Sequence, residues 1–334
     1  MWFLQLLITG GDFSPPFYLK MTNSQKKLEQ AQSYLKENQY NQAIRLLREI
    51  HEACPEEESA LLMLAWAYYD SGDMARALDC FHNLFEMELQ RKVFTGFAYD
   101  ELVRIYKQEK KYDDLVKICE KAVAAQNQDK YLLTELGKAY LQAGRAQEAC
   151  AVYEKMIKME EDDAALYCLW GEALFAAGLV AESEDAYARC VQIDPEQESH
   201  YYFKLAALFQ QARKDNEAVR VIKKCIAINQ DNPLYHCFYG DCLISMGRIE
   251  EACGVYNQAV QCGGGTEAAV YYNRLGNSLM KAGCFVEAAE YFRKALDKEN
   301  NEIYYNGLIS ACRAMGKEDE AQKNIHELGK IKKA

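Results

Sequence analysis

The chain has 334 residues, of which 50% are hydrophobic, and its formal net charge at neutral pH is −11. This apolar composition excludes a disordered chain, and the acidic balance leaves no basic face for phosphates, so nucleic acid is excluded as the expected partner. The 13 cysteines are odd in number and scattered, without a Cys-x-x-Cys pair. This pattern predicts free thiols in a reducing cytoplasm, with neither a disulfide scaffold nor a bound metal.

Residues 1–23 are predicted to form an unstructured N-terminal extension. Residues 1–11 are apolar, but they include no basic residue and are too few to span a bilayer. Two interpretations stay open: either Met21 is the true start, or the segment is a weak export signal or membrane tether. The missing positive flank favours the first interpretation, and with it a cytoplasmic protein without a membrane span.

Pairs of small residues recur from residue 24 onward with a period of about 34 residues, which indicates a repeat array. The pair is clear at Gly137 and Ala149, and again at Gly240 and Ala252. The second small site falls, repeat by repeat, at Ala43, Ala77, Leu115, Ala149, Ser183, Ala218, Ala252, Ala288 and Ala321. The array at 24–334 is therefore predicted to contain about nine repeats, with approximate bounds 24–57, 58–91, 96–129, 130–163, 164–197, 199–232, 233–266, 269–302 and 303–334.

Each repeat has the pattern of two helices joined by a tight turn. A large apolar residue follows the first small site by three positions, as the packing of two helices requires. Between the two halves lies a residue suited to a left-handed backbone. These turn sites are Asn38, Gly72, Lys110, Gly144, Gly178, Arg213, Gly247, Gly283 and Gly316. No proline falls inside a predicted helix and no useful stretch alternates as a strand would, so the array is predicted to be all-α.

Residues 24–334 resemble tetratricopeptide repeats. The family signature is matched by Trp170-Gly171, by Leu136-Gly137 with Tyr140, and by Leu275-Gly276 with Ala288 and Phe292. The resemblance implies antiparallel helix pairs stacked into a right-handed α-solenoid of about nine repeats, with the first helices lining a concave groove. The array is then one continuous domain.

Catalytic, cofactor and metal sites are not expected. The five histidines are spread over different repeats, and no Ser-His-Asp or Cys-His spacing stands out. The glycine run at residues 263–265 lacks the Lys-Ser/Thr that follows in a phosphate-binding loop, so it is interpreted as a hinge between repeats. We expect a protein that is not an enzyme.

The resemblance places the partner-binding residues on the first helix of each repeat. Repeats 2 to 5 offer aromatic and apolar side chains beside a small basic cluster, namely Leu62, Trp66, Tyr69, Phe97, Tyr131 and Phe175 with Arg104, Lys107 and Lys138. Repeats 6 to 9 offer Phe203, Gln210, Cys237, Asp241, Asn273, Asn277 and Asn306. A bound peptide would place apolar groups in pockets and its carboxylates near the basic cluster. The alternative is that large residues such as Tyr131 and Phe175 are partly core.

The leading hypothesis is a non-catalytic scaffold or adaptor that captures a protein or peptide segment in its groove. A chaperone-tail adaptor is not expected, because Leu28, Gln32 and Met63 stand where the carboxylate clamp of that class needs lysine and asparagine. The runner-up is a structural protein that assembles with copies of itself through exposed array ends. A scaffold that regulates a peptide- or envelope-modifying enzyme is indistinguishable from the first hypothesis at this level.

Overall fold

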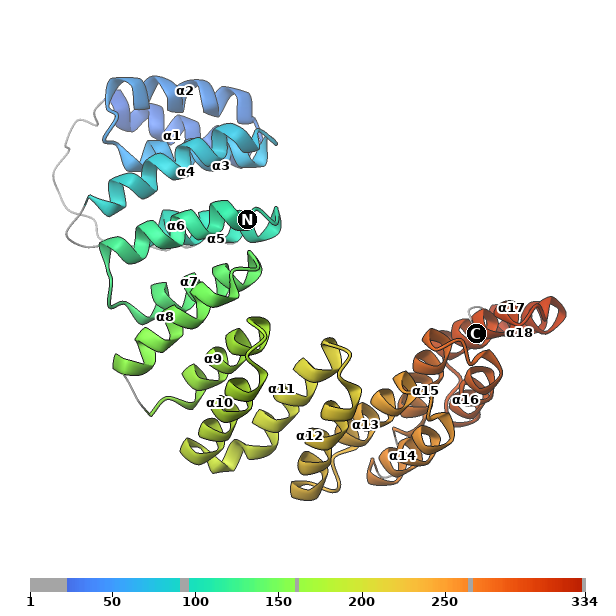
Figure 1. Ribbon diagram of the computed structural model, residues 1–334. Coiled ribbons are helices and arrows are strands. Elements are labelled where there is room, and N and C mark those ends of the chain that lie inside the picture. Colours follow the sequence, from blue (N-terminus) through green and yellow to red (C-terminus); the bar gives the residue numbers. More distant parts are fainter. Residues whose placement is uncertain (1–22, 91–95, 160–161, 264–266, 332–334) are drawn as a thin grey trace, which may run out of the picture. The chain divides into compact units, whose positions relative to one another are not determined.

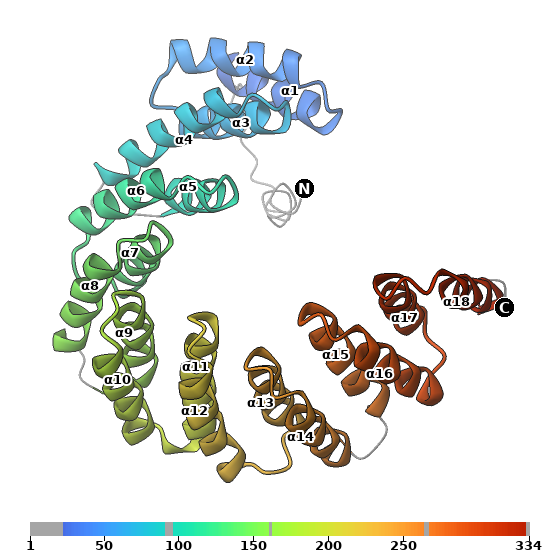
Figure 2. The same cartoon turned by 45° about the vertical axis from the view of Figure 1, so that its right-hand side comes forward.

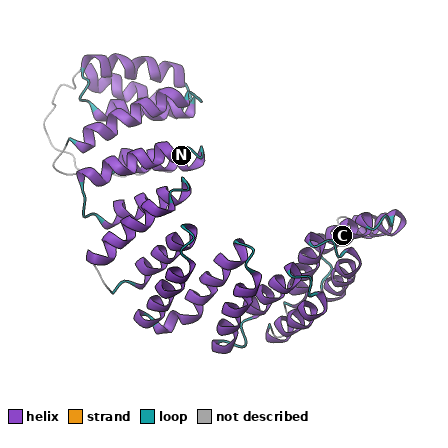
Figure 3. Ribbon diagram, in the orientation of Figure 1, coloured by secondary structure: helices purple, strands orange, loops and turns teal. Residues whose placement is uncertain are grey.

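The computed structural model describes residues 23–90, 96–159, 162–263 and 267–331, so the predicted extension and its Met21 start lie outside the described residues. Within these ranges the chain forms eighteen α-helices and one short 3-10 helix, Pro195–Gln197, without a strand (Figure 3). The first helices of the repeats are α1 (Asn23–Lys36), α3 (Glu58–Asp70), α5 (Phe97–Gln108), α7 (Lys130–Gln142), α9 (Ala164–Ala176), α11 (Glu198–Gln211), α13 (Pro233–Ser245), α15 (Ala268–Lys281) and α17 (Glu302–Ala314). The second helices are α2 (Tyr40–Ala53), α4 (Met74–Leu89), α6 (Tyr112–Ala125), α8 (Ala146–Met159), α10 (Val180–Ile193), α12 (Asp215–Ile228), α14 (Ile249–Cys262), α16 (Phe285–Lys298) and α18 (Glu318–Ile331).

The helices belong to two compact parts, an N-terminal part, Met1–Leu132, and a C-terminal part, Leu133–Ala334 (Figure 1). Within each part, helices pack against the other helix of their own repeat and against neighbouring repeats. In the C-terminal part, first helices of successive repeats also touch: α9 contacts α11, and α15 contacts both α13 and α17. Among the described residues, second helices of successive repeats do not pack together to that extent. The first helices therefore lie on the side of this part where successive repeats approach each other more closely, as Figure 2 shows for α13, α15 and α17.

All nine turn sites predicted from the sequence have a left-handed backbone. Their φ angles range from 55° at Lys110 to 87° at Gly72. In each turn the chain reverses between the two helices of a repeat; for example, the amide of Lys111 bonds the carbonyl of Tyr106 at 2.9 Å. The left-handed turn thus ends the first helix in the manner of a C-terminal helix cap, and a non-glycine residue occupies it in repeats 1, 3 and 6.

The first small site of a repeat makes room for an aromatic ring of the second helix. A Cβ atom added at Gly240 would come within 2.5 Å of the Tyr256 ring. The same relation, with less than 3.0 Å between the added atom and the ring, holds for Gly137 with Tyr153, Gly171 with Tyr187, and Gly276 with Phe292. These four rings are fully buried. The predicted close approach of the two helices is therefore a close approach of a backbone to a ring.

Two cysteines of the second helices are core residues that bond the preceding first helix. Cys190 and Cys225 are fully buried, and their thiols donate to the carbonyls of Ala164 (3.3 Å) and Ser199 (3.4 Å). Burial raises the pKa of both thiols to about 12, so they are protonated at neutral pH. They behave as small buried hydrophobes.

The predicted all-α solenoid of helix-turn-helix repeats is confirmed by these helices and their turns. Pro233 stands at the start of α13, as predicted. The handedness of the superhelix and the domain bounds of the extension and the array stay predictions.

Candidate functional site

The residues predicted to face a partner are divided between the two parts of the chain. In the N-terminal part, α3 and α5 place them in neighbouring repeats: Leu62, Trp66 and Tyr69 lie on α3, and Phe97, Arg104 and Lys107 on α5. Tyr131, at the start of α7, completes this group. In the C-terminal part, Lys138 lies on α7, Phe175 on α9, and Asn273 and Asn277 on α15.

Trp66, Tyr69 and Arg104 form one cluster, which we call the Trp66 surface. The Trp66 ring stands edge-on to Tyr69, with 5.5 Å between ring centroids, and equally close to the buried Phe81. The Arg104 guanidinium lies 5.7 Å from the centroid of the Trp66 ring and 5.2 Å from that of Tyr69. All three members of the surface are partly exposed. Aromatic rings and an arginine held in this way are the side chains that dominate protein interfaces.

Two of the three basic residues of the predicted cluster are held by acidic neighbours one helical turn earlier. The Arg104 Nε donates to Glu101 at 2.8 Å, and the Lys138 Nζ donates to Glu135 at 3.0 Å. The side chains of both glutamates are mostly buried, with 15% and 10% exposed. The positive charge offered to a ligand carboxylate is therefore reduced, and recognition of acidic groups at this cluster stays a prediction.

Two large aromatic residues of the predicted groove differ in their surroundings. Tyr131 is 54% exposed, and its hydroxyl donates to Asp100 at 2.9 Å. Phe175 packs edge-on against the buried Phe209, with 5.3 Å between ring centroids. Phe175 is thus partly a core residue, as the alternative interpretation has it, whereas Tyr131 presents most of its side chain to solvent.

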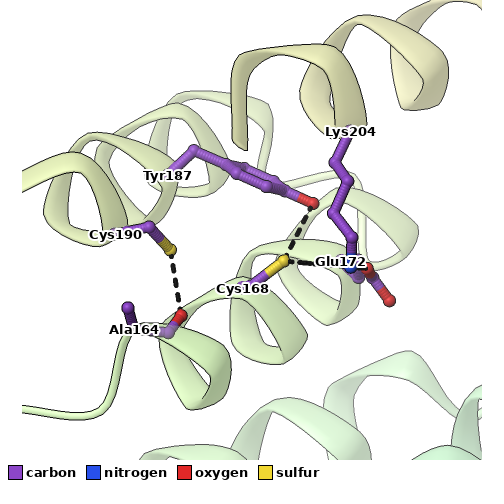
Figure 4. A network of polar contacts seen from close by, with 6 residues as sticks. All are labelled: Ala164, Cys168, Glu172, Tyr187, Cys190 and Lys204. Carbon is purple, nitrogen blue, oxygen red and sulfur yellow. Dashed lines mark hydrogen bonds and ion pairs between the residues drawn. The ribbon is translucent and has the colours of Figure 1, made fainter. Parts of the chain in front are cut away.

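A polar network in repeats 5 and 6 was not expected from the sequence (Figure 4). Lys204 on α11 donates to Glu172 on α9 at 3.2 Å, and its Nζ lies 3.4 Å from the Cys168 Sγ. The Cys168 thiol in turn lies 3.9 Å from the Tyr187 hydroxyl on α10. Burial raises the pKa of Cys168, while the Lys204 ammonium opposes that rise. The network joins two first helices and one second helix.

A second network occupies the equivalent place in repeats 7 and 8. The Asp241 carboxylate accepts hydrogen bonds from the Tyr256 hydroxyl (2.5 Å), from Ser278 (2.6 Å) and from Arg274 (2.8 Å). Burial alone would lower the pKa of Arg274, but its hydrogen bond to Asp241 and the charge of that carboxylate raise the pKa above its ordinary value. The three donors satisfy the Asp241 carboxylate, so it presents little free negative charge.

The two networks share a sequence signal that periodicity alone did not single out. In each, a cysteine precedes an acidic residue by four positions, a tyrosine follows on the second helix, and a basic residue comes from the next repeat. The sequence did place Cys237 and Asp241 among the groove residues. The prediction for Cys237 is wrong, because this side chain is fully buried beside the second network. Its small size lets the first helices pack closely there.

Three segments of the chain match models of the tetratricopeptide repeat: residues 34–88, 134–198 and 269–302. These three segments are tetratricopeptide repeats. These matches cover repeats in both parts, and together with the helix pairs they confirm the resemblance.

Solved structures with a similar arrangement include other proteins of helical repeats. A crystal structure of MamA is 20% identical, with a TM-score of 0.39, and the match covers 52% of this chain and 93% of that one. MamA 41-end from Desulfovibrio magneticus RS-1 is 17% identical, with a TM-score of 0.37 over 52% of this chain and 96% of that one. YrrB, described as a TPR protein with an unusual peptide-binding site, is 16% identical, with a TM-score of 0.35; the match covers 59% of this chain and 97% of that one. No curated protein matches the chain.

The described ranges lack two features, a membrane-spanning helix and a metal-binding cluster. No helix there is long and apolar enough to cross a membrane. The same residues contain no group of three or more His, Cys, Asp or Glu side chains arranged to hold a metal ion.

Proposed function

We propose that this chain is a non-catalytic adaptor, which binds a segment of a partner protein on its first helices and uses the Trp66 surface as a principal contact. Arrays of tetratricopeptide repeats serve as protein–protein interaction scaffolds, and this chain is built as one. The Trp66 surface supports the finer proposal, because it combines partly exposed Trp66 and Tyr69 with an arginine whose plane is already oriented. Little side-chain entropy is lost when a partner covers such a prearranged cluster.

The partner is a protein or peptide in this proposal, and its place of action is the cytoplasm. The net charge of −11 supports the exclusion of nucleic acid. No catalytic role, cofactor or metal is part of the proposal.

A cross-linking pull-down tests the role of the Trp66 surface. The chain would be compared with the double variant Trp66→Ala/Arg104→Glu and with a matched control, Tyr202→Ala/Lys224→Glu. The control removes a similar cation–aromatic pair in repeat 6 of the C-terminal part, with the Lys224 Nζ 4.6 Å from the Tyr202 centroid. A partner lost with the first variant and kept with the control supports the proposal. A partner kept with both removes the Trp66 surface as the site.

Self-assembly through the array ends is the second candidate, and the end helices argue against it. The exposed side chains of α1 include Lys26, Glu29, Gln30 and Gln32, and those of α18 include Glu318, Asp319, Gln322 and Glu327. Polar faces of this kind disfavour the stacking of α1 or α18 on a copy of the chain. A molar mass that stays that of a monomer as concentration rises supports the adaptor, and a mass that grows supports assembly.

A further inference from the structure

Three exposed apolar side chains occupy the same position in repeats 7, 8 and 9. Leu234 on α13, Val270 on α15 and Ile303 on α17 are 54%, 51% and 61% exposed. Each stands six residues before the first small site of its repeat, so the three are structurally equivalent. Because α15 contacts both α13 and α17, these residues lie at equivalent positions of three adjoining first helices in the C-terminal part. We call these three residues the apolar row.

Asparagine amides lie beside the apolar row, one turn further along the helices. Asn273 and Asn306 follow Val270 and Ile303 by three positions, and Asn277 comes one turn later. Asn277 and Asn306 are exposed, while Asn273 is partly buried and its Oδ1 has no hydrogen-bond partner. In repeat 7 the position equivalent to Asn277 carries Asp241, whose charge is taken up by Arg274. The face thus offers apolar groups and neutral amides.

The spacing of the first helices selects the conformation of a ligand that would lie across them. Helices in contact have axes about 8–10 Å apart. A polyproline-II segment advances about 3.1 Å per residue with three residues per turn, so it presents equivalent side chains about every 9.3 Å. An extended strand presents the side chains of one face about every 6.7 Å, so these side chains do not stay aligned with the residues of the apolar row.

Backbone chemistry separates polyproline II from an α-helical ligand. A helix also repeats one face at a comparable interval, about 10.5 Å over seven residues. Its carbonyls are bonded internally, however, whereas those of polyproline II are free to accept hydrogen bonds. The amides of Asn273, Asn277 and Asn306 are suitable donors for these carbonyls.

From the apolar row, the amides and the helix spacing, we propose that the first-helix face of repeats 7–9 binds a neutral polyproline-II segment with an apolar residue at every third position. This inference rests on the proposed adaptor function and adds the chemical class of one partner. The free carbonyls of the ligand meet the asparagines, and its apolar residues meet Leu234, Val270 and Ile303 in turn. Recognition without a charge pair makes the affinity insensitive to salt.

Fluorescence anisotropy with the full chain tests the proposal. The probe is a fluorescein-labelled, amidated peptide of four Leu-Pro-Pro triplets, and the control probe has three Leu-Pro-Pro-Pro quartets. The triplet peptide is expected to bind at least about tenfold more tightly, because only its leucines match the row, and a tenfold change corresponds to about 1.4 kcal/mol. Equal affinity of the two peptides, or no binding of either, would overturn the proposal.

A pair of matched variants locates the binding. Val270→Asp places a charge in the middle of the row and is expected to weaken the triplet peptide about tenfold or more. Val286→Asp is the control, since Val286 is 68% exposed on the second helix α16 and is expected to leave binding unchanged. Both side chains are exposed, so the fold is retained, and circular dichroism checks this. An unchanged affinity in Val270→Asp would contradict the assignment.

The two proposals fail separately. If the peptide does not bind but a cellular partner still depends on the Trp66 surface, the adaptor function stands and only the polyproline-II assignment falls. If the peptide binds and no partner depends on Trp66, the working surface of the adaptor is the apolar row.

Discussion

At the scale of single residues, the fit within a repeat depends on glycines that face buried aromatic rings. Tyr256 is fully buried, and its hydroxyl is anchored on Asp241 at 2.5 Å, so the ring has no room to move away from Gly240. By contrast, a Cβ added at Gly254, on the second helix of the same repeat, would meet nothing within 4 Å. The two glycines therefore occupy opposite environments in one repeat.

Substituting these glycines by alanine is expected to change stability in opposite directions. Gly240→Ala forces the added carbon against Tyr256 and should lower the free energy of unfolding by about 1–3 kcal/mol. Gly254→Ala should raise it by about 0.5–1 kcal/mol, because alanine loses less backbone entropy in a helix. Urea unfolding followed by circular dichroism measures both. Equal effects of the two variants on the free energy of unfolding would show that the Tyr256 ring does not restrict the size of the side chain at position 240.

His82 is a second residue whose chemistry depends on its packing. Its Nε2 lies 2.5 Å from the hydroxyl of Tyr106, on the neighbouring α5. Burial lowers the pKa of His82, and the charge of Lys121 lowers it further, against the opposing effect of Asp79, Glu86 and Asp114. Burial also raises the pKa of Tyr106 to about 12, so the contact joins a protonated tyrosine hydroxyl to the imidazole.

The lowered pKa of His82 predicts acid sensitivity of the N-terminal part. The unfolded chain binds the proton more readily than the folded one, so this contribution to stability is complete above the ordinary value of 6.5 and is lost as pH falls below it. His82→Gln keeps a hydrogen-bonding group near Tyr106 but does not titrate. The melting temperature of the variant is expected to fall less steeply with acidification. A slope identical to that of the unchanged chain would assign the acid sensitivity to other groups.

At the scale of the helix pair, the left-handed turn sets where the first helix ends. Glycine takes this conformation without strain, but Lys110 and Arg213 hold φ angles of 55° and 58°. A side chain with a Cβ is strained there by about 1–2 kcal/mol. The two repeats keep their turns because the flanking helices pack well, so local strain is outweighed by burial.

Glycine at these two turns should therefore stabilise the chain. Lys110→Gly and Arg213→Gly are each expected to raise the free energy of unfolding by about 0.5–1 kcal/mol, since relief of strain exceeds the extra entropy of the unfolded glycine. Gly144→Ala, in an equivalent turn with open space around it, provides the reverse control and should destabilise. Chemical denaturation reports all three. Destabilisation by Lys110→Gly would mean that its side chain has a structural contact of its own.

At the scale of the whole molecule, the chain offers two interaction surfaces of different chemistry. The Trp66 surface in the N-terminal part combines aromatic rings with a cation, whereas the row formed by Leu234, Val270 and Ile303 in the C-terminal part is uncharged. Because repeats contact only their neighbours, a change at one surface is expected to leave the other intact. The pull-down and the peptide titration therefore report on independent sites.

Periodicity along the chain was sufficient to predict the helices, their pairing and all nine turns. These features are local: small residues such as Gly240, and the turn residues, act through their own backbone and the adjacent helix, so their spacing in sequence carries the information. Trp66, Tyr69 and Arg104 were placed on the first helices by the resemblance to tetratricopeptide repeats, and their role in binding a partner stays a prediction.

Contacts between repeats depended on the folded structure. That Phe175 packs on Phe209, and that Cys237 is buried while Leu234 is exposed, follow from side-chain packing among several helices. Such packing depends on side-chain orientation and on the distance between repeats, which a pattern of small and large residues does not specify. The polar networks around Glu172 and Asp241 emerge only when three helices meet, since their members are far apart in the sequence.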